Sequence, residues 1–154
     1  MSSVAEERLK SLGIELPAAP PAVGAYVPVV KFGHLVVTSG QLPFVGGSLV
    51  FSGKVGGNLS VEEGSQAARI AAINALAQLR HAVGSLNQIK QIVRVEGYVN
   101  SAPGFHGHAQ VMNGASNLLA DVLGEAGRHT RIAVGANELP LDAAVEVVVW
   151  AEVS

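Results

Sequence analysis

The stretch Arg131-Ile132-Ala133-Val134, continued through Leu139-Pro140 to Val145-Glu146-Val147, decides the fold of this 154-residue chain. It predicts two β-strands joined by a short turn at the proline, because apolar residues alternate on both sides of that turn. Arg131 and Glu146 each fall opposite the more apolar stripe of their own strand. Only 14% of the residues are charged, so two charges within strands need a reason. One reason is a solvated sheet face. The other is a guanidinium that binds a carboxylate beside a polar partner, unless the two charges simply form a structural ion pair.

The other elements follow from capping patterns and glycines. Ser3 with Glu6 predicts a short helix over residues 4–12, and Ser60 with Glu63 predicts a long helix that ends before Gly84. A further helix is expected over residues 107–123. Additional strands are expected at residues 27–30, 35–39, 49–51 and 91–100.

This order, β-β-β-α-β-α-β-β after a short N-terminal helix, predicts an α+β fold. We expect a two-layer sandwich in which two main helices cover one face of a mixed β-sheet. Residues 1–154 would form a single domain, with residues 1–21 as a helix and connector extension. The other sheet face is left without helices; its predicted residues are Ile92, Arg94, Glu96, Tyr98, Ala144, Val148 and Trp150. Another subunit is the economical cover for this face, so a homo-oligomer is expected.

Composition excludes several classes of function. The net charge of −2 offers no basic surface for a nucleic-acid backbone. The absence of cysteine removes disulfides, thiol nucleophiles and thiolate metal sites. The five histidines lack metal-ligand spacing, and no glycine pattern matches a nucleotide-binding loop, so neither metal nor cofactor is expected. Charges interrupt the N-terminal residues, and no apolar run is long enough to span a membrane, which favours the cytoplasm.

Four further positions are candidate binding residues, each with an ordinary alternative. Tyr26 is either an amphipathic rim residue or part of a pocket. Ser39 and the Gly40 amide follow a strand and could donate hydrogen bonds to a ligand, whereas a serine nucleophile lacks its usual glycine context. Asn113 precedes Gly114 in a helix, a poor helical pair that either distorts the helix locally or is used for binding.

Taken together, these residues resemble one known family. Arg131, Leu139-Pro140 and Glu146 are similar to the C-terminal signature of the reactive intermediate deaminase family, also named RidA, YjgF or endoribonuclease L-PSP. Gly24-Ala25-Tyr26 resembles its Gly-Pro-Tyr segment, Ser39-Gly40-Gln41-Leu42-Pro43 its Ser-Gly-Gln-x-Pro, and Val111-Met112-Asn113 its Val-Asn site. The resemblance spans about residues 22 to 153. The chain departs from the pattern where His129-Thr130 replace small residues before the arginine, and it is longer than typical members.

The resemblance implies a chorismate-mutase-like fold, a homotrimer and active sites between subunits. The implied reaction is hydrolysis of reactive enamines and imines, such as 2-aminoacrylate and its imine tautomer, to a 2-keto acid and ammonia. Arg131 would hold the substrate carboxylate and Glu146 would position the attacking water. Tyr26, Ser39, Gly40 and Asn113 would bind the substrate. Two rival functions are a non-catalytic trimer that binds small carboxylates and an endoribonuclease or translation inhibitor; few aromatic residues and a negative charge disfavour RNA.

Overall fold

The computed structural model describes residues 4–154 of the protein. Its helices are α1 (Val4–Ser11), α2 (Val61–Val83) and α3 (His108–Leu123), with short 3-10 turns η1 (Leu86–Gln88), η2 (Gly124–Gly127) and η3 (Pro140–Asp142). Its strands are β1 (Val29–Phe32), β2 (Leu35–Thr38), β3 (Phe44–Val45), β4 (Ser48–Leu49), β5 (Ile89–Asn100), β6 (Thr130–Ala136) and β7 (Val145–Val153). No described helix is long and apolar enough to cross a membrane.

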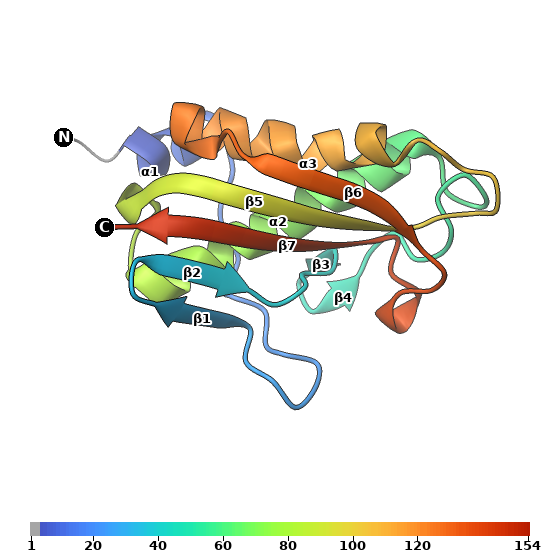
Figure 1. The fold of residues 1–154 in the computed structure, drawn as a ribbon, viewed down its shortest axis with the longest axis horizontal. Coiled ribbons are helices and arrows are strands. Elements are labelled where there is room, and N and C mark those ends of the chain that lie inside the picture. The colour runs from blue at the N-terminus through green and yellow to red at the C-terminus, as the bar shows by residue number, and fades with distance from the viewer. Residues whose placement is uncertain (1–3) are drawn as a thin grey trace.

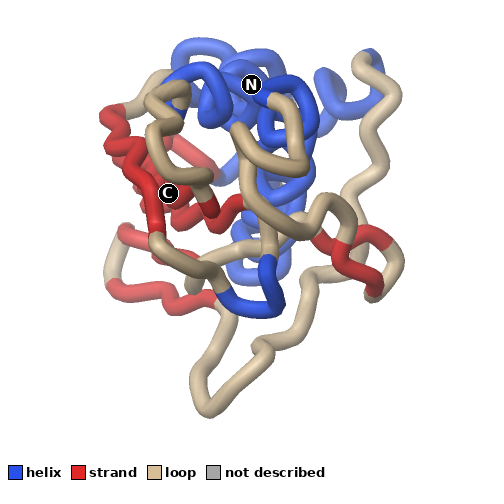
Figure 2. The backbone as a smooth tube through the Cα atoms, turned by 90° about the vertical axis from the view of Figure 1, so that its right-hand side faces the viewer, coloured by secondary structure: helices blue, strands red, loops and turns tan. Residues whose placement is uncertain are grey.

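Five strands form one mixed sheet in the order β1-β2-β7-β5-β6 (Figure 1). Strands β5 and β6 run parallel, and the other neighbours are antiparallel. The helices gather on one side of the strands, which confirms the predicted two-layer α+β fold (Figure 2). One detail was wrong: the third predicted strand does not join this sheet. It contributes β4 to a separate hairpin with β3, because glycines 46 and 47 turn the chain back at once.

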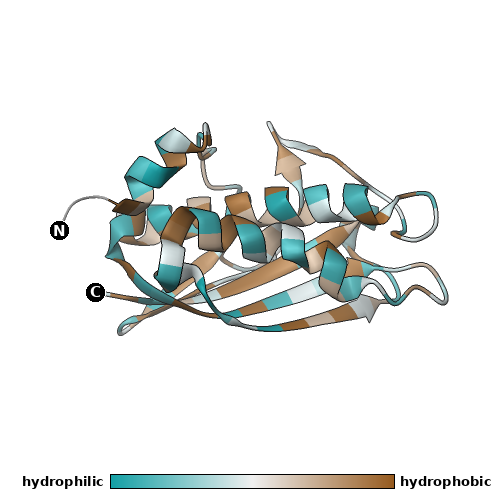
Figure 3. Ribbon diagram, turned by 90° about the horizontal axis from the view of Figure 1, so that it is seen from above, coloured by the Kyte–Doolittle hydropathy of each residue, from teal (hydrophilic) through white to brown (hydrophobic). Residues whose placement is uncertain are grey.

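Helix α2 supplies most of the core. Ser60 accepts a hydrogen bond from the Glu63 amide, and the Glu63 side chain accepts one from the Ser60 amide, so the predicted capping box is confirmed. Gly84 ends the helix in the left-handed conformation. The alanine-rich face of α2 is fully buried between the sheet and α3, which runs alongside it over the sheet (Figure 3).

Two glycines allow α3 to approach its neighbours closely. A Cβ on Gly114 would lie 2.0 Å from the Ser65 carbonyl oxygen of α2, and a Cβ on Gly97 of β5 would lie 2.4 Å from the Met112 sulfur. The Asn113-Gly114 pair is therefore explained by backbone packing between helices. Helix α3 continues through both residues, so the predicted local distortion was wrong.

The uncovered sheet face differs slightly from the predicted set. Arg94, Glu96, Tyr98, Val148 and Trp150 remain partly exposed on it. Ile92 and Ala144, by contrast, are fully buried in the core. A register irregularity between Ile92 and Arg94 breaks the strict alternation, so Ile92 faces the helices.

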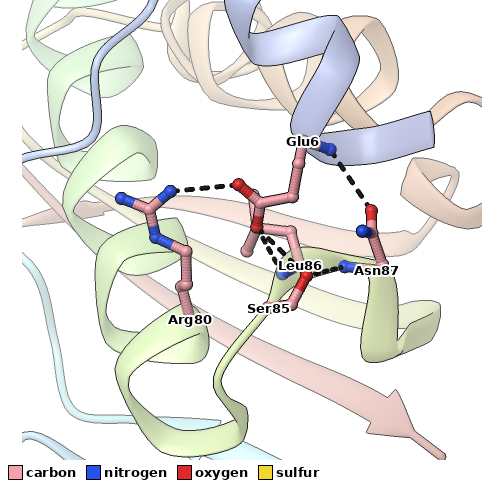
Figure 4. A network of polar contacts seen from close by, with 5 residues as sticks. All are labelled: Glu6, Arg80, Ser85, Leu86 and Asn87. Atoms are coloured by element: carbon pink, nitrogen blue, oxygen red, sulfur yellow. Dashed lines mark hydrogen bonds and ion pairs between the residues drawn. The ribbon is translucent and has the colours of Figure 1, made fainter. Parts of the chain in front are cut away.

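The N-terminal extension is fixed to the helical layer by one carboxylate (Figure 4). Glu6 of α1 accepts hydrogen bonds from Arg80 at 3.0 Å and from the Leu86 amide at 2.8 Å. The predicted capping box of Ser3 with Glu6 falls partly outside the described residues. Among the described residues, the Glu6 side chain binds Arg80 near the end of α2 and the Leu86 amide of η1. Ala5 and Leu9 join the main hydrophobic cluster.

We expect Gly114→Ala to destabilise the protein by about 1–3 kcal/mol, because α2 and α3 must separate to accept the methyl group. An exposed helical glycine would give the opposite sign, since alanine favours a helix by about 1 kcal/mol. Urea unfolding measures the difference. Gly57→Ala is the matched control: its nearest contact would be an ordinary 3.4 Å, so we expect a change within about 0.5 kcal/mol.

Candidate functional site

Arg131 lies on the helix-facing side of the edge strand β6. Parallel pairing places it beside Val95, whose side chain is fully buried under the helices. Ile132, which alternates with it, lies on the uncovered face and is 40% exposed. The more apolar stripe of β6 thus faces away from the helices, because a strand at the sheet edge has room for a long polar side chain beside α3.

The guanidinium of Arg131 is held by neutral groups of α3. Its Nη1 donates to Asn113 Oδ1 at 3.0 Å and to Ser116 Oγ at 3.1 Å, and its Nη2 donates to the Ala109 carbonyl at 3.4 Å. Among residues 4–154 it forms no ion pair with a carboxylate. A guanidinium ordered in this way keeps its positive charge available for an anion.

A histidine extends this cluster. His129 Nε2 lies 2.8 Å from Ser116 Oγ, and its Nδ1 lies 2.6 Å from the Gly127 carbonyl. Burial lowers the pKa of His129; the hydrogen bond to Gly127 opposes this effect, and the charge of Arg131 adds to it. Sequence reasoning assigned no role to Ser116 or His129. Ser116 had one usable signal, since it follows Asn113 by three residues and so shares its helix face.

Glu146 lies on the opposite face of the sheet from Arg131. It pairs with Tyr98 across β7 and β5, on the face without helices. The two side chains therefore do not form the structural ion pair that the sequence left open. Burial raises the pKa of Glu146 above the ordinary 4.5. A Cβ on Gly40 would lie 1.9 Å from a Glu146 carboxylate oxygen, so a side chain at position 40 would displace the carboxylate from its observed place.

The remaining predicted residues lie near Gly40. Tyr26 is 48% exposed, and its hydroxyl accepts a hydrogen bond from the Val23 amide at 3.3 Å. Ser39 Oγ donates to the Val27 carbonyl at 2.6 Å. Its hydrogen is engaged there, so toward a ligand Ser39 offers lone pairs rather than the donor that was predicted. Tyr26 and Gly40 both border one small cavity beside the connector.

A second polar cluster occupies the middle of the uncovered face. Glu96 accepts hydrogen bonds from Tyr98 at 3.0 Å and from Trp150 at 2.9 Å, and it forms an ion pair with Arg94 at 3.5 Å. The hydrogen bond to Glu96, together with burial, raises the pKa of the Tyr98 hydroxyl. These contacts satisfy the charges of Arg94 and Glu96 from within the protomer.

The candidate residues thus form two groups. One contains Arg131 and Asn113 at the β6 edge. The other contains Tyr26, Ser39, Gly40 and Glu146, and lies across β5 from β6, near β7 and β2. Two larger cavities, of about 470 and 590 Å³, are lined by other residues, near the connector and near Lys54 respectively. Arg131 and Glu146, one from each group, lie on opposite faces of the sheet.

Comparison with known proteins decides the family. The family described as "YjgF/chorismate_mutase-like, putative endoribonuclease" matches residues 6–153. The chain belongs to this family. Membership agrees with the resemblance inferred from the motifs and with the observed fold.

Relatives resemble the chain over nearly its whole length. Protein TCP17 of Trypanosoma cruzi is 45% identical over 154 residues, covering 96% of this chain and 95% of that protein. A structure named a putative endoribonuclease from Shewanella oneidensis is 41% identical with a TM-score of 0.95, covering 97% of this chain and 99% of that one. Escherichia coli TdcF with bound serine is 25% identical with a TM-score of 0.66, covering 88% and 94%.

The lowered pKa of His129 predicts that the free energy of unfolding of this YjgF-family chain depends on pH. Below the ordinary value of 6.5 the unfolded chain takes up a proton that the folded chain resists, so stability falls as pH drops through this range. We expect His129→Gln to lose less unfolding free energy than the wild type between pH 7 and pH 5. Urea unfolding at several pH values tests this, with the exposed His81→Gln as control. Parallel curves for wild type and His129→Gln would contradict the prediction.

Proposed function

We propose that this protein hydrolyses reactive 2-imino acids and their enamine tautomers, of the 2-aminoacrylate type, to 2-keto acids and ammonia. The observation that carries the proposal is the Arg131 guanidinium, which is ordered by three neutral acceptors and has no carboxylate partner among the described residues. Such a group matches the carboxylate of an imino acid. The structure of TdcF with bound serine supports it, since serine also presents a carboxylate beside an amine nitrogen.

The chemistry needs little beyond orientation. The enamine tautomer first takes a proton on its terminal carbon to become the iminium ion, which is the protonated imine. Water then adds to the C=N carbon while a base takes one of its protons, giving a carbinolamine. The base returns this proton to the nitrogen, and ammonia leaves as the hydroxyl loses its own proton to form the keto acid. Glu146 suits the base because its raised pKa brings it nearer to neutral pH than an ordinary glutamate. Arg131 fixes the acid so that the C=N carbon meets this water.

We further propose that Arg131 of one protomer meets Glu146 of a neighbouring one. The two residues lie on opposite faces of the same sheet, so a single chain does not bring them together. A two-fold dimer that placed Arg131 against Arg131 would not complete the site. A head-to-tail contact joins the Arg131 edge to the Glu146 face, and repetition around an axis closes a ring. The family resemblance sets the expected number of protomers at three.

We expect Arg131→Ala to lower kcat/KM for 2-aminoacrylate deamination by about 100-fold or more, because a charge-assisted bidentate contact is lost. The measurement is pyruvate release from 2-aminoacrylate generated enzymatically. Arg128→Ala is the matched control, since Arg128 is exposed and pairs with Glu125 at 3.8 Å. A wild-type rate for Arg131→Ala would show that the assigned mechanism is wrong. Pyruvate binding without turnover of any imine would favour a carboxylate-binding regulator instead.

Subunit complementation tests the shared site. Glu146→Gln alone should lose about 100- to 10,000-fold in rate, as expected for a general base. Mixing unfolded Arg131→Ala and Glu146→Gln chains and refolding them together should restore about a quarter of wild-type activity, because one in four neighbouring pairs then has both native halves. Each variant refolded alone is the control. Activity that stays absent in the mixture would contradict a site between protomers.

The names of relatives also raise RNA cleavage. The chain has a net charge of −2 and 5% aromatic residues, which provide neither a basic groove nor stacking rings. Small imino acids therefore fit this chain better than RNA does.

A further inference from the structure

The hydrogen bonds around Ser116 have only one consistent direction. The Gly127 carbonyl can only accept, so His129 Nδ1 carries the hydrogen of their 2.6 Å contact. In a neutral imidazole Nε2 is then a bare acceptor, and the Ser116 hydroxyl donates to it at 2.8 Å. This leaves the lone pairs of Ser116 Oγ for the Nη1 hydrogen of Arg131 at 3.1 Å. The relay runs from Arg131 through Ser116 and His129 to the backbone.

The far end of this relay is rigid. Gly127 is buried in η2, and a Cβ on it would lie 2.2 Å from the Leu119 carbonyl oxygen of α3. The carbonyl that accepts from His129 is therefore fixed against the same helix that carries Ser116. A hydrogen-bond relay that is anchored at both ends holds the side-chain torsions of Arg131 more firmly than a single contact with an exposed side chain would.

The other end determines which edge of the guanidinium stays free. Asn113 and Ser116 use both hydrogens of Nη1, and Ala109 uses one hydrogen of Nη2. No described residue accepts from Nε. Nε and Nη2 lie on one side of the planar group and form a fork that matches the two oxygens of a carboxylate. Rotation about the terminal side-chain bonds of Arg131 would turn the Nε–Nη2 edge toward α3.

We propose that His129 is a positioning residue that, through Ser116, holds the Nε–Nη2 edge of Arg131 toward the substrate carboxylate. The inference rests on the proposed carboxylate role of Arg131. His129 contacts no substrate, so it acts on affinity and leaves the chemical step alone. The neutral state of the imidazole, which its lowered pKa favours, keeps Nε2 an acceptor at neutral pH.

Two substitutions of His129, each placing an amide at the position of one ring nitrogen, separate positioning from general packing. In His129→Gln the side-chain amide reaches the position of Nε2 and can still accept from Ser116. In His129→Asn the amide reaches only the position of Nδ1, so Ser116 loses its acceptor. Ser116→Ala removes the middle of the relay. We expect His129→Asn and Ser116→Ala to weaken pyruvate binding about three- to tenfold, the equivalent of one hydrogen bond. His129→Gln should stay within twofold of wild type.

Three measurements on the assembled full-length protein complete the test. Calorimetric titration with pyruvate gives the affinity for an unreactive carboxylate. Steady-state deamination should show a raised KM with kcat nearly unchanged, because the contact is made equally in ground and transition states. In nitrogen NMR, Arg131 Nη1 and Nη2 should give separate signals in wild type and His129→Gln, and averaged signals in His129→Asn. A purely structural role for His129 would not change these signals selectively.

The outcomes separate this inference from the proposed function. Unchanged pyruvate affinity and separate Arg131 signals in a folded His129→Asn variant overturn the positioning role alone. Pyruvate binding that depends on Arg131 and His129, without turnover of any imine, supports the positioning role and refutes deamination. Pyruvate affinity that is unchanged in Arg131→Ala overturns both.

Discussion

The parallel pairing of β6 with β5 is the constraint on which the candidate site depends. It sets Arg131 in register with Val95, so the arginine side chain must share the helix-facing layer with buried residues. A charge in that position is tolerable only because β6 is an edge strand and α3 supplies acceptors. Moving the register by one residue would exchange Arg131 for Ile132 and put the guanidinium on the uncovered face.

Close packing at glycines brings further polar residues next to Arg131 and Glu146. Gly114 and Gly97 let α3 settle onto α2 and β5, which brings Asn113 and Ser116 within reach of the arginine. Gly40 has the same effect on the other group, because the Glu146 carboxylate occupies the space of a missing side chain. In both groups, the absence of a side chain at a glycine allows the close contacts that place the polar residues.

Much of this arrangement could be predicted from the sequence, and the failures have physical causes. The capping box of α2, its end at Gly84 and the layered fold were all readable from local patterns. Which face Arg131 occupies was not, because alternation shows that neighbours differ but does not show which side the helices cover. Ile92 was misassigned because a local irregularity in pairing is invisible in a residue pattern. The link from Ser116 to His129 joins a helix to the residue before a strand, and no spacing rule connects them.

The sheet has two edge strands, β1 on one side and β6 on the other. Phe32 of β1 is 75% exposed, and β6 presents unpaired backbone groups along its outer side. Exposed edge strands can pair with an extended segment of another chain, and such pairing promotes aggregation. The proposed contact at the Arg131 edge would cover the β6 edge strand as well as complete the proposed site. A substitution that prevented this contact would leave β6 open to unwanted strand pairing.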